Sequence, residues 1–212
     1  MLSELPEGPA KQLLATSYEE ELLVGQNIYR ELPEPRYAFA ALLVEGLLRT
    51  YVTSPQGRRM ALRYTHPGEI IGLTGMVRGS APAGADVLIQ GSMLRLDLAT
   101  LRRLAQSEAS VSWAVARQLA NELAGYSTLR SANLFGSVRV RVARHLLELA
   151  TRHGEGLAAR ITQQELADSV GSVREVVARV LVALKDEDII AREGKQIVIL
   201  DADRLEGIAE GR

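Results

Sequence analysis

Short hydrophobic runs dominate the first half of the chain, from about Tyr18 to Leu98. Runs such as RRMALRYT, EIIGL and DVLIQGSMLRLDL are separated by glycine and proline, for example at Pro67-Gly68. Short runs at this spacing are typical of antiparallel sandwiches and barrels. The pattern predicts an antiparallel β domain over residues 1–99, with a short helix within the first 16 residues.

A helical pattern follows over residues 100–136. Between Thr100 and Leu134 the chain has no proline and only one glycine. Apolar positions recur there at intervals of three and four residues, which is the spacing of a coiled-coil stripe. A long helix with such a narrow stripe either packs on its own domain or pairs with a second copy. We favour a dimerisation helix followed by a hinge, with the homodimer interface formed by Ala116, Leu119, Leu123 and Tyr126.

The last segment, residues 137–212, opens with an amphipathic helix, VRVRVARHLLELATR. Thr162–Glu165 and Ser172–Glu175 both have the form of a capping box, which predicts two helices that start ten residues apart. Gly171 supplies the turn between them. Two apolar runs around Glu193-Gly194-Lys195 then predict a β-hairpin. Together these elements predict a helix-turn-helix followed by a wing.

The second helix of this pair has two different faces on a helical wheel. One arc is apolar and the opposite arc carries Arg174, Glu175 and Arg179 around the small Ala178. An arginine fork can bond a guanine edge twice, and a glutamate can accept from a cytosine amino group. Charges on the outer face of a helix are commonly only solvated, and Glu175 also fits the capping box. The neighbouring capped helix, glycine turn and hairpin favour a base-reading surface. The apolar arc consists of Val173, Val176, Val177, Val180, Leu181 and Leu184.

The composition narrows the classes of protein without selecting one. The formal net charge of −1 gives no indication of a nucleic-acid partner. The absence of cysteine excludes disulfides, thiolate nucleophiles and cysteine-ligated metal centres. The acidic start MLSELPEGPAK has no hydrophobic core of a signal peptide, and no apolar stretch is long enough to span a bilayer. We therefore expect a cytoplasmic protein without a membrane partner.

An enzymatic function finds little support in the sequence. The three histidines are His66, His145 and His153, and only His66 lies in the β region, whereas a cupin-type metal centre needs several converging ligands. The chain has no phosphate loop, nucleophile elbow or dinucleotide-binding glycine motif. We expect no catalytic residue and no bound metal.

The stretch ITQQELADSVGSVREVVARVLVALKDEDIIAREGKQIVI resembles the DNA-binding signature of the Crp/Fnr superfamily of bacterial transcription regulators. The resemblance continues upstream through LANELAGYSTLRSANLFGSVRVRVARHLLELA and into HPGEIIGLTGM, which is similar to the family's β-roll turn. It implies an α+β fold with an N-terminal antiparallel β-roll, a jelly roll of the cyclic-nucleotide-binding type. A long dimerisation helix and a C-terminal winged helix-turn-helix complete the implied fold.

The resemblance also implies a function and a set of contacts. Arg174, Glu175 and Arg179 have the Arg-Glu-x-x-x-Arg form of the cyclic-AMP receptor branch, which reads a TGTGA-like half-site. The implied partners are double-stranded DNA with an inverted repeat, a second copy of the chain and RNA polymerase. The implied contacts to the DNA backbone are Thr162, Gln163, Gln164, Ser172 and Lys195.

The family's effector pocket centres on a Gly-Glu pair and on an arginine that grips the cyclic phosphate. Gly72-Leu73 and Ala83-Gly84 stand at those positions here, while Tyr126 and Ser127 stand where the helix reaches the ligand. Burying a phosphate without an arginine is poorly compensated, so we expect no cyclic-nucleotide cofactor. Haem sensing would depend on His66, and a lone histidine in a turn is more commonly a surface residue. Three alternatives remain. The β-roll binds another small ligand, it binds no ligand, or the protein is a β-roll regulatory subunit that does not bind DNA.

Overall fold

The computed structural model describes residues 5–29, 39–55, 57, 59–79, 83–154, 156–194 and 196–211, with the backbone alone for 127–135 and 153. The chain divides into two compact units. The first comprises Met1–Thr53 and Ala61–Tyr126, and the second comprises Ser54–Met60 and Ser127–Arg212.

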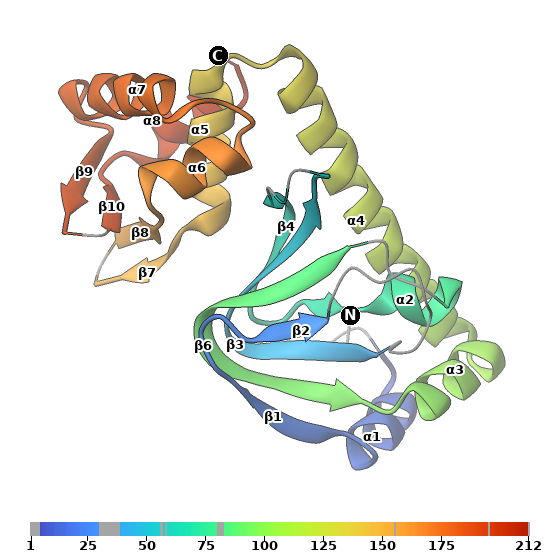
Figure 1. The fold of residues 1–212 in the computed structure, drawn as a ribbon. Coiled ribbons are helices and arrows are strands. Elements are labelled where there is room, and N and C mark those ends of the chain that lie inside the picture. Colours follow the sequence, from blue (N-terminus) through green and yellow to red (C-terminus); the bar gives the residue numbers. More distant parts are fainter. Residues whose placement is uncertain are drawn as a thin grey trace. The chain divides into compact units, whose positions relative to one another are not determined.

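The first unit is built on an antiparallel sheet (Figure 1). Its main strands run in the order β1-β6-β3-β4, while β2 pairs with β6 and β5 pairs with β3. The long strands β3 and β6 shift register beside Gly46 and Gly91, where an added Cβ would collide with the backbone of the opposite strand. Glycine therefore permits the close approach of the two strands. The bounds of the strands are β1 Tyr18–Leu22, β2 Asn27–Tyr29, β3 Ala40–Thr53, β4 Arg59–Thr65, β5 Ile70–Ile71 and β6 Gly84–Leu96.

In the part of the chain that the structure describes, four helices accompany this sheet. They are α1 (Glu7–Ala15), α2 (Leu73–Arg78), α3 (Leu98–Ser107) and α4 (Ala109–Phe135). The predicted short helix near the N-terminus is confirmed as α1. Helices α1 to α4 and strand β5 all contribute to one buried apolar cluster, which includes Leu13, Ile70, Leu73, Leu101, Leu104 and Val111.

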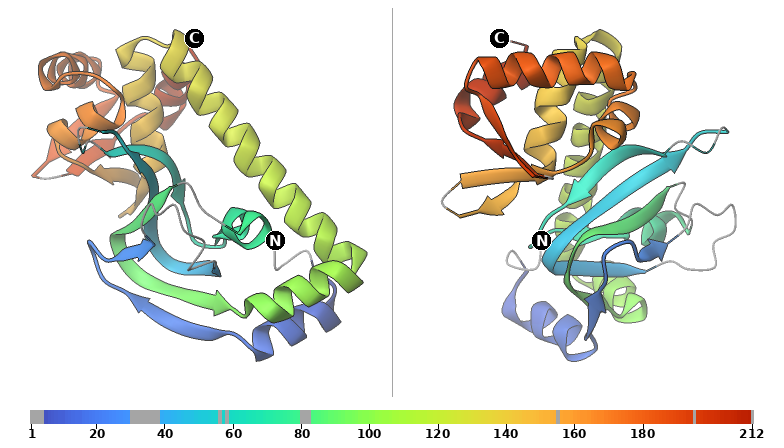
Figure 2. Two further views of the ribbon diagram at one scale, coloured as in Figure 1. Left: turned by 45° about the vertical axis from the view of Figure 1, so that its right-hand side comes forward. Right: turned by 60° about the vertical axis from the view of Figure 1, so that its left-hand side comes forward.

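The predicted helical segment 100–136 contains two helices instead of one. Glu108 has an extended backbone (φ −118°, ψ 108°) and separates α3 from α4, which meet at an angle in Figure 2. Serines flank the break at positions 107 and 110, and their side chains compete with the helical backbone hydrogen bonds. The hydroxyl of Ser112 donates back across the break to the carbonyl of Ala105.

The second unit combines helices with a small antiparallel sheet in the order β7-β8-β10-β9. The hairpin of β9 and β10 confirms the predicted wing. The hairpin of β7 and β8 and the last helix, α8, were not predicted. The bounds are α5 Val138–Leu149, β7 Thr151–His153, β8 Gly156–Arg160, α6 Gln163–Ser169, α7 Arg174–Asp186, β9 Ile190–Glu193, β10 Gln196–Ile199 and α8 Ala202–Ala209.

The core of the second unit lies between its helices. Helices α5, α6, α7 and α8 each bury aliphatic side chains, and Arg144 of α5 donates to the carbonyl of Ala209 at the end of α8 (2.7 Å). The fully buried members with side chains larger than alanine are Val142, Leu146, Leu166, Val177, Leu184 and Leu205. The two units together confirm the predicted fold class, a β-roll followed by a long helix and a winged helix-turn-helix.

Candidate functional site

Helix α6 begins with the capping box that the sequence predicts. The Thr162 hydroxyl accepts from the Glu165 backbone N–H (3.2 Å), and the Glu165 carboxylate accepts from the Thr162 N–H (2.9 Å). This reciprocal pair satisfies two backbone donors at the first turn.

The prediction of a second capping box, at Ser172 and Glu175, is wrong. Helix α7 begins at Arg174 with Val173 as its N-cap, and no side chain caps it. The reason lies at the end of α6, where the N–H of Gly171 bonds to the Asp168 carbonyl and that of Ser172 bonds to the Ala167 carbonyl. This is a Schellman motif with Gly171 in the left-handed conformation (φ +64°). Ser172 therefore belongs to the end of α6, and the carboxylate of Glu175 has no capping role.

The outer face of α7 carries the three predicted base-reading residues. Arg174, Glu175 and Arg179 are exposed, and the part of the chain that the structure describes gives them no hydrogen bond or ion pair. Val177, Leu181 and Leu184 are buried on the opposite side. Val173 departs from the predicted apolar arc because it is 59% exposed at the helix start. The outer face thus offers both forked donors and a carboxylate acceptor to a ligand.

Three of the five predicted backbone-contacting residues, Thr162, Gln163 and Gln164, lie at the start of α6. Thr162 and Gln164 are exposed, Gln163 is half-buried, and Gln164 donates to Asp168 (3.1 Å). Ser172 is half-buried in the turn, and Lys195 lies outside the described residues.

A cleft of about 210 Å³ joins the start of α6 to α7 and strand β9. Gln163 and Ala178 line it together with two cations that the sequence analysis did not single out, Lys185 and Arg192. Lys185 and Arg192 lie in the segments that the sequence predicts as the second helix of the pair and as the wing. Their positions in these segments could therefore have identified them as candidate DNA contacts. The cleft therefore places basic side chains beside the outer face of α7, which carries the predicted base-reading residues.

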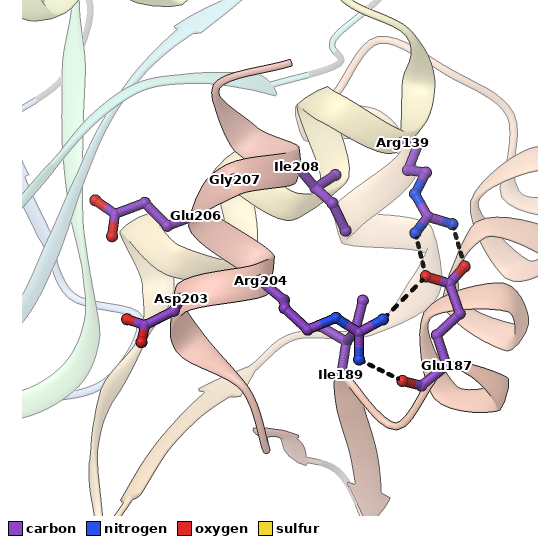
Figure 3. A pocket seen from close by; sticks show the side chains of 8 residues that line it. All are labelled: Arg139, Glu187, Ile189, Asp203, Arg204, Glu206, Gly207 and Ile208. Atoms are coloured by element: carbon purple, nitrogen blue, oxygen red, sulfur yellow. Dashed lines mark hydrogen bonds and ion pairs between the residues drawn. The ribbon is translucent and has the colours of Figure 1, made fainter. Parts of the chain in front are cut away.

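The far end of α7 is held by a cluster of ion pairs, shown in Figure 3. Glu187, the C-cap of α7, accepts two hydrogen bonds from Arg139 of α5 (2.6 and 2.7 Å). Arg204 of α8 donates to the Glu187 carbonyl (3.0 Å) and lies 3.8 Å from its carboxylate. The hydrogen bond from Arg139 holds the pKa of Glu187 below its usual value. These contacts line a groove of about 600 Å³ and fix the C-terminal end of α7 to α5 and α8.

The predicted effector residues of the β-roll offer no polar side chain. Gly72 has a φ of +93° and caps α2, while Leu73 is fully buried in the apolar cluster. Ala83 is buried, and a Cβ on Gly84 would lie 2.6 Å from the ring of Tyr51. Tyr126 is half-buried, and the side chain of Ser127 lies outside the described residues.

Among the described residues of this unit, two mostly buried ion pairs were not predicted from the sequence. Arg49 of β3 forms a two-point contact with Asp86 of β6 (2.7 and 3.1 Å). Arg63 of β4 bonds to Glu122 of α4 (2.9 Å), whose side chain is 8% exposed. No sequence signal marks these pairs, because their partners are far apart along the chain.

The exposed face of α4 differs from the predicted dimer stripe. Ala116 and Leu123 are exposed, and Leu123 is 66% exposed to solvent. Leu119 and Tyr126 are half-buried, and Leu119 packs against the apolar cluster of its own unit. Trp113, which is 69% exposed, and Ala120 complete an open apolar face at helical spacing. We call Trp113, Ala116, Ala120 and Leu123 the α4 face.

Comparisons with known proteins agree with this arrangement. The sequence profile of the cyclic nucleotide-binding domain matches residues 19–108, and that of the Crp-like helix-turn-helix domain matches residues 140–208. The transcriptional regulator LdrP of Thermus thermophilus is 32% identical over 191 residues, which cover 85% of this chain and 91% of LdrP. The chain belongs to the Crp/Fnr superfamily.

Other members of the superfamily are similar over most of their length. The cAMP-activated global regulator CRP of Salmonella typhimurium is 29% identical over 74% of this chain and 78% of its own. The crystal structure of a Crp/Fnr-family regulator from Thermus thermophilus aligns with a TM-score of 0.71 at 27% identity, over 91% of this chain and 98% of that one. These relatives are transcription regulators, so the helix-turn-helix of this Crp/Fnr protein is a DNA-binding domain.

Membrane-spanning helices and metal-binding clusters are both absent from the described residues. None of the helices there is long and apolar enough to cross a membrane. No group of three or more histidine, aspartate or glutamate side chains in the same residues is arranged to hold a metal ion.

Proposed function

We propose that this Crp/Fnr protein is a sequence-specific transcription regulator, and not an enzyme, that binds an inverted, TGTGA-like repeat as a homodimer. The observation that carries the proposal is the outer face of α7, where Arg174, Glu175 and Arg179 are exposed and unpaired within the described residues. Arginine forks and a carboxylate near the start of a recognition helix can read guanine and cytosine edges. RNA polymerase is the further partner that the family implies.

Dimerisation is supported by the α4 face. Trp113, Ala116, Ala120 and Leu123 recur at intervals of three and four residues and are exposed in the single chain. A second copy of α4 would bury these side chains in the manner of a coiled coil. Two recognition helices related by a two-fold axis would then meet two half-sites about one helical turn apart.

Cyclic AMP is not expected to control this protein through the usual pocket, although CRP of Salmonella typhimurium is cAMP-activated. The β-roll residues Ala83 and Gly84 provide no cation for a phosphate. The arginines Arg49 and Arg63 already bond to carboxylates. We propose no other cofactor.

Titration of the purified protein on labelled duplexes tests the proposal. We expect tight binding to an inverted TGTGA-like repeat and weak binding to the same bases in scrambled order. The affinity should fall steeply with salt, because binding releases counterions from the phosphates. Equal affinity for both duplexes would refute sequence-specific recognition, and heat released on adding cyclic AMP would refute the ligand claim.

A further inference from the structure

Arg63 connects helix α4 to the sheet from a mostly buried position. Its Nη1 donates to Glu122 Oε1 (2.9 Å), and its Nη2 donates to Glu69 Oε2 (3.0 Å). The side chain of Arg63 is 18% exposed and that of Glu122 is 8% exposed. The Glu69 carboxylate also accepts from the backbone N–H of His66 (3.0 Å), which fixes it in the turn before β5. We call Arg63, Glu69 and Glu122 the Arg63 cluster.

Two tyrosines border the Arg63 cluster. Burial raises the pKa of Tyr29 to about 12, and the charges of Glu122 and Arg63 act on it as well. Burial also raises the pKa of Tyr126, with Glu122 and Arg63 again acting on the phenol. Both phenols are therefore neutral near pH 7, and the cluster itself contains two carboxylates and one guanidinium, a net charge of −1. A buried ion pair is costly to form unless its geometry is good, so this cluster needs an explanation beyond stability.

The position of Glu122 suggests what the cluster does. Glu122 lies about one helical turn before Tyr126, the last residue of α4 that belongs to the first unit. Beyond that residue α4 continues into the unit that carries the DNA-binding helices. A contact that holds α4 here fixes the direction in which the helix leaves the β-roll.

We infer that the Arg63 cluster takes the place of a small-molecule effector, by fixing α4 to the β-roll through bonds made entirely within the chain. The inference rests on the proposed function, because its consequence is a DNA-binding form that needs no ligand. An anionic effector would have to displace Glu122 or Glu69 from Arg63, so the cluster also opposes ligand entry. The proposed effect of the Arg63 cluster is conformational and involves no covalent step.

The Glu122→Gln substitution tests this inference, because it removes the charge and nearly preserves the shape. Asp86→Asn is a matched control, because Asp86 belongs to the other mostly buried ion pair, with Arg49, and this pair joins β3 to β6 within the sheet. We expect both variants to lose thermal stability. Only Glu122→Gln should lose affinity for the inverted repeat, by about tenfold, a typical size for coupling between two sites. Arg63→Lys keeps the charge but loses the fork, so we expect a smaller loss.

The result that would overturn the inference is wild-type DNA affinity in both Glu122→Gln and Arg63→Lys. Hydrogen exchange gives a second readout that does not depend on DNA. The amides of residues 113–126 should exchange faster in Glu122→Gln than in Asp86→Asn, and equal rates would also contradict the role of the cluster. If the wild-type protein itself fails to select the repeat, the proposed function fails, whereas the exchange comparison still decides whether the cluster holds α4.

Discussion

Arg174 and Arg179 are single residues whose role can be separated from folding. Both are exposed and have no partner among the described residues, so replacing either with alanine removes no internal contact. We expect Arg174→Ala and Arg179→Ala each to cost about 1–3 kcal/mol of discrimination at one base pair. Binding-site selection from random duplexes measures the change. Arg160→Ala, at an exposed arginine of β8, is the control and should keep the wild-type preference.

Val173 is a second single residue whose substitution should have a measurable effect, in this case on stability. It is the N-cap of α7, its backbone is extended (φ −102°, ψ 150°), and its side chain cannot accept a hydrogen bond. Val173→Asp should therefore stabilise the protein by about 1 kcal/mol, because aspartate is among the best N-cap residues. Denaturant unfolding measures the gain. Val182→Asp, at a second exposed valine inside the same helix, has no free N–H to cap and should not stabilise.

Single residues also show what the sequence could and could not predict. The Thr162–Glu165 capping box is a local pattern, and the structure contains it. The similar pattern that starts at Ser172 forms no capping box, because the preceding helix uses that residue in its own termination. The pairs of Arg49 with Asp86 and of Arg63 with Glu122 had no local pattern at all, because only the folded sheet brings them together.

At the scale of elements, helix α4 carries the dimerisation prediction. Leu123 is 66% exposed at the C-terminal end of the α4 face, so a charge there need not disturb the core of one chain. We expect Leu123→Glu to give folded monomers that bind the inverted repeat much more weakly than wild type. Light scattering and circular dichroism together check this outcome. Asn121→Glu adds the same charge at another exposed position of α4 and should leave the dimer intact.

Elements with strong periodicity were predicted, and short ones were missed. The β-roll strands, α5 and the wing follow from runs of apolar residues bounded by turn signals. Strands β7 and β8 were missed because Thr151–His153 and Gly156–Arg160 are short and show little alternation. They pair with each other, and β8 also pairs with β10 of the predicted wing. Their strand character thus comes from the neighbouring strands more than from their own composition.

At the scale of the whole molecule, stability should depend on pH through Glu148. Burial raises the pKa of this α5 carboxyl from 4.5 to about 7, while the charge of Arg144 opposes the shift. A raised folded pKa means that the contribution to stability is complete below pH 4.5 and is lost as the pH rises through about 7. We expect the free energy of unfolding to fall between about pH 4.5 and 7, with a slope of at most about 1.4 kcal/mol per pH unit from this group.

Denaturation of the full chain at several pH values in this range measures the slope. Glu148→Gln removes the titrating group and should flatten the profile. An unchanged slope in that variant would assign the pH dependence to other groups. Glu187 does not interfere in this window, because its pKa is lowered and its own contribution is lost only in more acidic solution.

The break at Glu108 has a consequence for how the α4 face is oriented. Each residue of an α-helix turns the chain by about 100°, so one inserted residue rotates everything that follows in the same helix by that angle. An insertion within α3 can be absorbed at the extended Glu108, because the rotational phase of α4 is set anew at Ala109. An insertion between Trp113 and Leu123 cannot be absorbed in this way, and it would turn Leu123 away from the line through Trp113 and Ala116. A change of length before Glu108 therefore leaves the orientation of the α4 face unchanged, whereas one within the α4 face would disrupt the proposed pairing.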